Sequence, residues 1–351
     1  WGALVINTQL LKPFSFVKDN FRDAFDTGAE LNNTLSLSGG TESSTYFLSY
    51  GNINSDDMMP SDNDTYKRNT VSLSGSTKFK GFSASTTINY VGRKSRFVET
   101  GQGLSGIGAN FYEEILQIPV DIPIQEFEDY KNLYFNVDNY FTPFAENPYY
   151  PLYENGSRFN SDRVYGNLDL KYQAAKWLSF QFQQGADVTN GVNRIWHAKN
   201  APSPGSWNDG ANVEGAQRQA DVGNVVEGSE KYFEYDSKLH ALFDADLTDK
   251  FDITGLIGLN YNDRGYRTLY SSVEDLVIPG FYNLNNSVNS PVSVETQTHR
   301  RLIGAYASAT LGYRNFAYLT LSARNDWSST LPQGENSYFY PSANLSVIVS
   351  D

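Results

Sequence analysis

Residues that could carry out chemistry are few and scattered in this sequence. The three histidines, His197, His240 and His299, lie on separate segments without the spacing of metal ligands. Cysteine is absent, so neither a thiolate metal site nor a disulfide can form. No Ser-His-Asp order, nucleophile elbow or pair of carboxylates indicates catalysis. We therefore expect no enzyme, no metal site and no cofactor.

One stretch fits a nucleotide-binding pattern, Gly101-Gln-Gly-Leu-Ser-Gly106, which reads G-x-G-x-x-G. That pattern binds a dinucleotide only inside a parallel βαβ unit. The surrounding chain reads as antiparallel hairpins, so a flexible loop is the simpler interpretation. The formal net charge of −13 also argues against a nucleic-acid partner.

Aromatic residues in two long polar segments are the better candidates for binding a substrate. Segment 93–162 holds fourteen aromatic residues. They either form a small core of the segment itself, or some of them, such as Tyr149, Tyr150 and Tyr153, stack on a ligand. Trp196 and Trp207 lie in the next polar segment, where no apolar period explains them. Aromatic faces bind sugars and peptide side chains alike, so we expect substrate contacts from these five residues.

The elements that must position these residues are hairpins, and the clearest spans residues 69–91. Val71, Leu73 and Phe79 alternate with polar residues, and so do Phe82, Ile88 and Tyr90 after the turn at Lys80-Gly81. Alternation gives each arm one apolar and one polar face. Each arm has about ten residues, and a tilted strand needs roughly 9–11 to cross a bilayer. The hairpin therefore suits a membrane barrel, although a soluble β-sandwich would also alternate.

The rest of the chain repeats this pattern over eleven predicted strands. In residues 233–247, odd positions such as Phe233 and Leu239 should face lipid, and even positions such as Asp236, Lys238 and His240 the lumen. Short turns near 39–43, 80–81, 175–176, 248–249 and 314–315 alternate with long connections near 53–66, 93–162, 189–231, 264–299 and 328–337. Outer-membrane barrels place short turns on one side and long loops on the other. No run of 18 apolar residues occurs, and mean hydropathy is −0.47. We predict an all-β, antiparallel transmembrane β-barrel.

Several stretches resemble SusC/RagA-type TonB-dependent outer-membrane transporters. They are Leu35-Ser-Leu-Ser-Gly-Gly-Thr-Glu42 with Tyr46-Phe-Leu-Ser-Tyr-Gly51, Tyr66-Lys-Arg68, Asn147-Pro-Tyr-Tyr150, Arg163-Val-Tyr-Gly-Asn167, and Ala323-Arg-Asn-Asp-Trp-Ser-Ser-Thr-Leu-Pro332 with Tyr338-Phe-Tyr-Pro341. The resemblance implies a barrel of 22 strands around an N-terminal plug. Eleven strands here would be the first half, with the plug missing from this chain. Because single-chain bacterial barrels have even strand numbers, an odd count also indicates missing strands, and the terminal strands should not pair with each other.

The resemblance further implies active import of oligosaccharides or oligopeptides across the bacterial outer membrane. The implied partners are a SusD-like surface lipoprotein that closes over the loops, the TonB-ExbB-ExbD motor acting through segments absent here, and the lipid bilayer. Residues 1–30 would be a plug-to-barrel connection or first-strand region, and residues 31–351 the N-terminal half of the barrel. Two alternatives remain open: a passive porin-like or structural barrel, and a soluble carbohydrate-binding β-protein.

Overall fold

The structure is a computed structural model, and it describes residues 14–98, 110–209 and 220–349. Eleven strands form one sheet in chain order, every neighbouring pair antiparallel. The strands are β1 (Ala29–Gly40), β2 (Ser44–Asp56), β3 (Thr65–Phe79), β4 (Phe82–Phe97), β5 (Gly156–Ala175), β6 (Leu178–Asn200), β7 (Asp221–Thr248), β8 (Phe251–Glu274), β9 (Val292–Tyr313), β10 (Ala317–Ser328) and β11 (Ser337–Val347). The predicted all-β antiparallel fold with eleven strands is confirmed. So is the absence of pairing between β1 and β11, which form the two edges.

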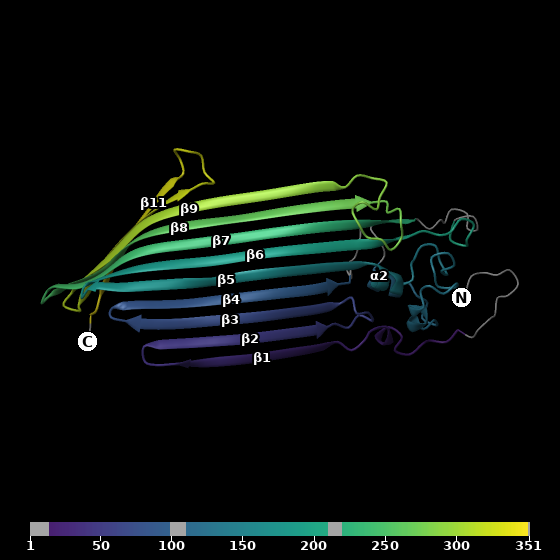
Figure 1. Cartoon of the computed structure of the whole chain (residues 1–351), viewed down its shortest axis with the longest axis horizontal. Coiled ribbons are helices and arrows are strands. Elements are labelled where there is room, and N and C mark those ends of the chain that lie inside the picture. The colour runs from purple at the N-terminus through teal and green to yellow at the C-terminus, as the bar shows by residue number, and fades with distance from the viewer. Residues whose placement is uncertain (1–13, 99–109, 210–219, 350–351) are drawn as a thin grey trace.

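The short turns lie at one end of the sheet and most of the longer connections at the other, whereas the connection between β10 and β11 lies apart from the latter (Figure 1). The turn between β3 and β4 consists of Lys80 and Gly81, both with positive φ, as a two-residue hairpin turn requires. The connections 57–64, 98–155, 201–220 and 275–291 gather at the other end, called here the long-loop end. Helical pieces are short: η1 (Arg22–Ala24), α1 (Phe111–Ile115), η2 (Ile124–Glu128) and α2 (Tyr149–Glu154). No helix in the described ranges is long and apolar enough to span a membrane.

The strands run further than the sequence predicted, which corrects the expected loop bounds. β6 continues to Asn200 and β7 starts at Asp221, so the connection between them is 201–220 and not 189–231. β8 and β9 likewise shorten the connection expected at 264–299 to 275–291. Strand pairing continues here through residues whose polar and apolar types do not alternate regularly, so the period of two did not reveal these strand ends.

Alternation along each strand separates two faces of the sheet. On β7, Leu239 pairs with Phe182 of β6 and Leu259 of β8. These three side chains share the apolar face, whereas the even-numbered residues of β7 lie on the polar face with Asn260 and Asn262. The odd- and even-numbered residues of 233–247 thus occupy opposite faces, as predicted, with Ser237 and Leu242 as the exceptions to the apolar–polar alternation.

The apolar face forms a band that runs obliquely to the strands. Phe82, at the turn end of β4, is in register with Tyr172, Phe180, Ala241 and finally Ile257 of β8. On β8 the apolar positions extend six residues beyond Ile257 toward the turn, as far as Phe251. With a rise of roughly 3.3 Å per residue and a strand spacing of roughly 4.8 Å, this offset over four strand steps gives a tilt of roughly 45°. Strands of closed transmembrane barrels tilt by about 35–45°.

A compact core fills the connection between β4 and β5. Phe111, Phe127, Tyr140 and Leu152 are almost fully buried in it, which confirms the interpretation that the aromatic residues of this segment pack on one another. The preceding residues 14–28 also pack there: the Asn20 amide nitrogen donates to the Ile122 carbonyl at 2.8 Å. Residues 14–28 therefore lie at the long-loop end, before β1.

Candidate functional site

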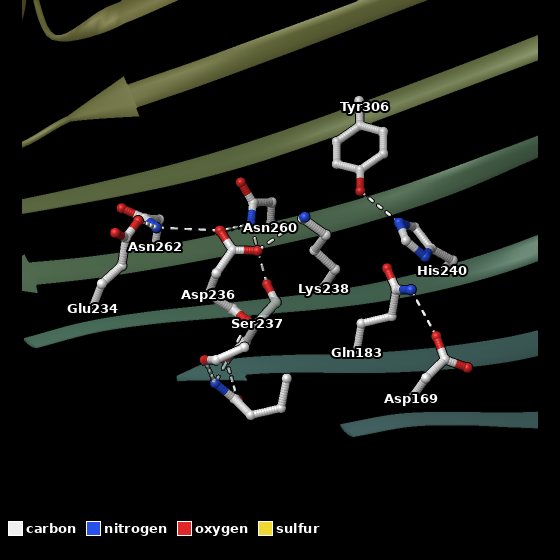
Figure 2. Close-up of polar contacts among 12 residues, drawn as sticks. Asp169, Gln183, Glu234, Asp236, Ser237, Lys238, His240, Asn260, Asn262 and Tyr306 are labelled. Carbon is white, nitrogen blue, oxygen red and sulfur yellow. Dashed lines mark hydrogen bonds and ion pairs between the residues drawn. The ribbon is translucent and has the colours of Figure 1, made fainter. Parts of the chain in front are cut away.

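The centre of the polar face carries a network of charged and amide side chains (Figure 2). The Asp236 carboxylate accepts hydrogen bonds from the Asn260 and Asn262 side-chain nitrogens at 3.1 and 3.2 Å. The Lys238 ammonium lies 3.0 Å from the other Asp236 oxygen. Asn262 also donates to Glu234 at 2.8 Å. Each residue reaches this network because it occupies an alternate position of β7 or β8 in direct register.

A second part of the network joins β7 to β9 and β10. The His240 Nε2 atom lies 2.6 Å from the Tyr306 hydroxyl (Figure 2). The Arg324 guanidinium stacks over the Tyr306 ring at 4.9 Å and forms an ion pair with Asp326 at 2.8 Å. A glycine of β8, Gly258, allows this approach, because a Cβ there would lie 2.5 Å from the Tyr306 ring.

Strands β5 and β6 extend the polar face sideways. The Asp169 carboxylate accepts hydrogen bonds from Gln181 and Gln183, both at 2.6 Å. The polar face therefore presents donors and acceptors of both charges over β5 to β10. Such a surface can bind water and polar solutes, and it contains no arrangement of nucleophile and base.

The long-loop end is held to the strands by hydrogen bonds from aromatic side chains. The Trp196 indole nitrogen and the Tyr282 hydroxyl both donate to the Glu154 carbonyl, at 3.0 and 3.1 Å. The Tyr150 hydroxyl donates to the Lys199 carbonyl at 3.2 Å. These bonds fix the end of the 98–155 connection against β6 and the 275–291 connection.

Three of the predicted substrate residues lie together on α2, around Tyr130. Tyr153 stacks on the Tyr130 ring at 5.6 Å, and Tyr150 meets that ring edge-on at 5.8 Å. Tyr149 is 1% exposed, whereas Tyr153 is 37% exposed. Burial, and then the negative charge of Glu128, raise the pKa of Tyr153 to about 12. Burial is also the largest cause of the raised pKa values of Tyr149 and Tyr150.

The rings of the two tryptophans predicted to contact substrate do not join that cluster, although the Trp196 indole donates to Glu154 at the end of α2. Trp196 is on β6, not in a polar loop as expected, and is 9% exposed. Its ring packs with Val225, Val273 and Leu276 in a small core. Trp207 lies in the 201–220 connection and is partly buried. The structure therefore brings Tyr149, Tyr150 and Tyr153 together and leaves the tryptophans separate.

A cavity of about 190 Å³ opens beside Tyr150 where the 98–155 connection meets β6, β7 and β8. Its lining includes Glu146, Asn155, Asn224 and Glu274. The lining also includes His197, whose Nδ1 atom lies 2.8 Å from the Asn224 side-chain oxygen. No sequence pattern predicts this cavity, because its residues come from separate segments that only strand register brings together.

Two further questions from the sequence concern a metal site and the G-x-G-x-x-G stretch. Within residues 14–98, 110–209 and 220–349, no group of three or more His, Asp or Glu side chains could hold a metal ion. The G-x-G-x-x-G stretch, residues 101–106, lies outside the described residues.

Comparison with known proteins gives similarity at the level of the fold. No protein-family model matches the sequence, and no curated protein matches it. The solved structure of the RagAB peptide transporter matches 92% of this chain, with a TM-score of 0.65 and 16% sequence identity. The RagAB peptide importer in its closed-closed and open-open states gives TM-scores of 0.66 and 0.64, with 16% and 18% identity and 93% of this chain covered.

The match covers only part of each solved chain. This chain spans about a third of their length, between 34% and 35%. Those structures are described as a peptide transporter or importer rather than an enzyme. The two-faced antiparallel sheet described above therefore has the same fold as part of the RagAB chains.

Proposed function

We propose that this sheet is part of the wall of a bacterial outer-membrane transporter that imports oligopeptides or oligosaccharides. The observation that carries the proposal is the two-faced sheet itself. Its apolar band is tilted as in a transmembrane barrel, its opposite face is polar across β5 to β10, and its long connections gather at one end. The fold likeness to the RagAB peptide transporter supports import, and favours oligopeptides as the first substrates to test.

The proposed whole protein works with partners that bind outside the described strands. A SusD-like surface lipoprotein would close over the long-loop end, where Tyr150 and Tyr153 lie on α2. The TonB-ExbB-ExbD motor would supply energy through a plug segment. In this proposal Tyr149, Tyr150, Tyr153, Trp196 and Trp207 belong to the substrate-proximal region. Tyr153, the most exposed of the three α2 tyrosines, is the one best placed to touch substrate directly.

Uptake by whole cells tests the proposal. Cells with and without the whole protein are given labelled oligopeptides or oligosaccharides, in backgrounds with and without TonB. We expect uptake that requires both the protein and TonB. Uptake that requires the protein but continues unchanged without TonB would identify a passive porin. A protein that fractionates as soluble would favour the carbohydrate-binding alternative.

A further inference from the structure

Basic residues face one another on the apolar side of β3, β4 and β5, just beyond the band. Lys67 of β3 is in direct register with Lys94 of β4. Two positions further along β4, Arg96 is in register with Arg158 of β5. Both pairs lie on the face of Val71, Tyr90 and Val164, because they occupy alternate positions of the same strands. Like charges directly opposite each other destabilise a sheet, so this arrangement requires a compensating interaction.

The protein compensates the Arg96–Arg158 pair in part, because the Arg158 guanidinium lies over the Trp196 ring at 5.2 Å, but it provides little compensation for Lys67 and Lys94. Lys67, Lys94 and Arg158 are exposed, and none of them forms an ion pair with a residue in the described ranges. Arg96 donates a hydrogen bond to the Asn63 side-chain oxygen. Asp162, the nearest acid on this face of β5, accepts a hydrogen bond from the Tyr90 hydroxyl at 2.5 Å.

The same face of β8 and β9 provides the contrast. There Arg267 pairs with Glu295 at 2.7 Å, and His299 lies 2.5 Å from Asp263. Arg301 lies 3.7 Å from the same Asp263 oxygen. Basic residues beyond the band on β8 and β9 are thus neutralised within the protein, whereas those on β3 to β5 are not. The overall charge of −13 conceals this local excess of cations.

The height of the Lys67–Lys94 pair suits a lipid headgroup. Lys94 lies four residues beyond Tyr90, which is about 13 Å along the strand and about 9 Å above the band at the tilt estimated above. The polar region on each side of a bilayer is roughly 5–7 Å thick. A lysine side chain can extend back toward that region while its stem covers apolar surface.

We propose that Lys67 and Lys94 bind the phosphate of a lipid in the leaflet at the long-loop end. This inference rests on the proposed membrane location. Phosphate oxygens accept several charge-assisted hydrogen bonds from basic side chains, and they would replace the repulsion between the two lysines by shared attraction to one anion.

Binding of a defined lipid to the whole purified protein tests the proposal. The probes are monophosphoryl lipid A, its dephosphorylated form and inorganic phosphate, each titrated in detergent and measured by native mass spectrometry. The Lys67→Gln/Lys94→Gln double variant should bind the phosphorylated lipid at least tenfold more weakly. Lys67→Arg/Lys94→Arg should retain binding, because the charges remain. Arg267→Gln/Glu295→Gln, which removes an internal pair from the same face, should stay within twofold of wild type.

The outcomes separate this inference from the proposed function. Equal binding by the double variant and the wild type would overturn the lipid site, and so would equal binding of the dephosphorylated lipid. Loss of inorganic phosphate binding without any change for the lipid would overturn it as well. Folding of each variant is checked by heat-modifiable migration on a gel. A protein that is membrane-integral and transports substrate but fails these tests lacks only the lipid site, whereas a protein that needs no detergent fails the proposed function itself.

Discussion

Replacing Trp196 should release the long-loop end from the strands without unfolding the sheet. The ring is 9% exposed among Val225, Val273 and Leu276. Removal of a buried tryptophan costs about 3–5 kcal/mol, so Trp196→Ala should raise the open population of this region by roughly 100- to 5,000-fold. Trp196→Phe keeps most of the packing but loses the hydrogen bond to the Glu154 carbonyl, which should cost only about 1 kcal/mol.

Limited proteolysis measures that opening, because cleavage of a transiently open region follows its population when closing is fast. The purified whole protein is digested, and cuts within 98–155 and 275–291 are followed by mass spectrometry. Cleavage rates should rank Trp196→Ala far above Trp196→Phe, and Trp196→Phe slightly above wild type. Trp207→Ala is the control, since Trp207 lies outside this core. If Trp196→Ala is cleaved at the same rate as wild type but binds substrate more weakly, the packing role is refuted and direct contact with substrate is favoured.

Three further predictions follow from the faces and the loop core. Leu239→Lys puts a charge in the apolar band and should destabilise the protein by roughly 2–4 kcal/mol, whereas Leu242→Lys on the polar face should cost less than roughly 1 kcal/mol. Urea unfolding in lipid vesicles measures the free energy of unfolding of both variants. Equal losses of stability would contradict the assigned faces. Burial, and then the charges of Asp57 and Asp56, raise the pKa of Asp64, so the wild-type loop loses stability as pH rises through that pKa. The Asp64→Asn variant should therefore resist proteolysis better than wild type at neutral pH and equally well in acid. A difference in cleavage rate that does not depend on pH would contradict this cause. Phe111→Ala removes a fully buried ring and should cost about 3–5 kcal/mol, seen as faster cleavage within 98–155, while unchanged cleavage would show that this core is not what orders the connection.

The strand centres could be predicted from the sequence, but their outer ends could not. Between Phe251 and Tyr261 an apolar residue occupies every second position except Gly255, and this period of two predicts the strand. Beyond Tyr261, β8 continues to Glu274 through a mixture of polar and apolar residues without a period of two, and backbone pairing with β7 and β9 maintains the strand. No composition signal marks such an extension, and the loops were therefore predicted too long.

The contacts of the candidate site depend on register across several strands. His240 was expected on the polar face, but its partner Tyr306 lies 66 residues away on a strand that is not adjacent to β7. Trp196 had no apolar period around it because its neighbours Val225, Val273 and Leu276 come from other segments. Turn lengths and bulges set such alignments, and local sequence patterns do not specify them.

Chemical labelling of the two faces of β7 tests the central claim most directly. The sequence contains no cysteine, so Lys238→Cys and Leu239→Cys each introduce a single thiol on opposite faces of one strand. In native membranes, Lys238→Cys should react with a water-soluble maleimide, and Leu239→Cys only with a reagent that partitions into the bilayer. Equal labelling of both thiols by the water-soluble reagent would contradict a membrane-spanning wall.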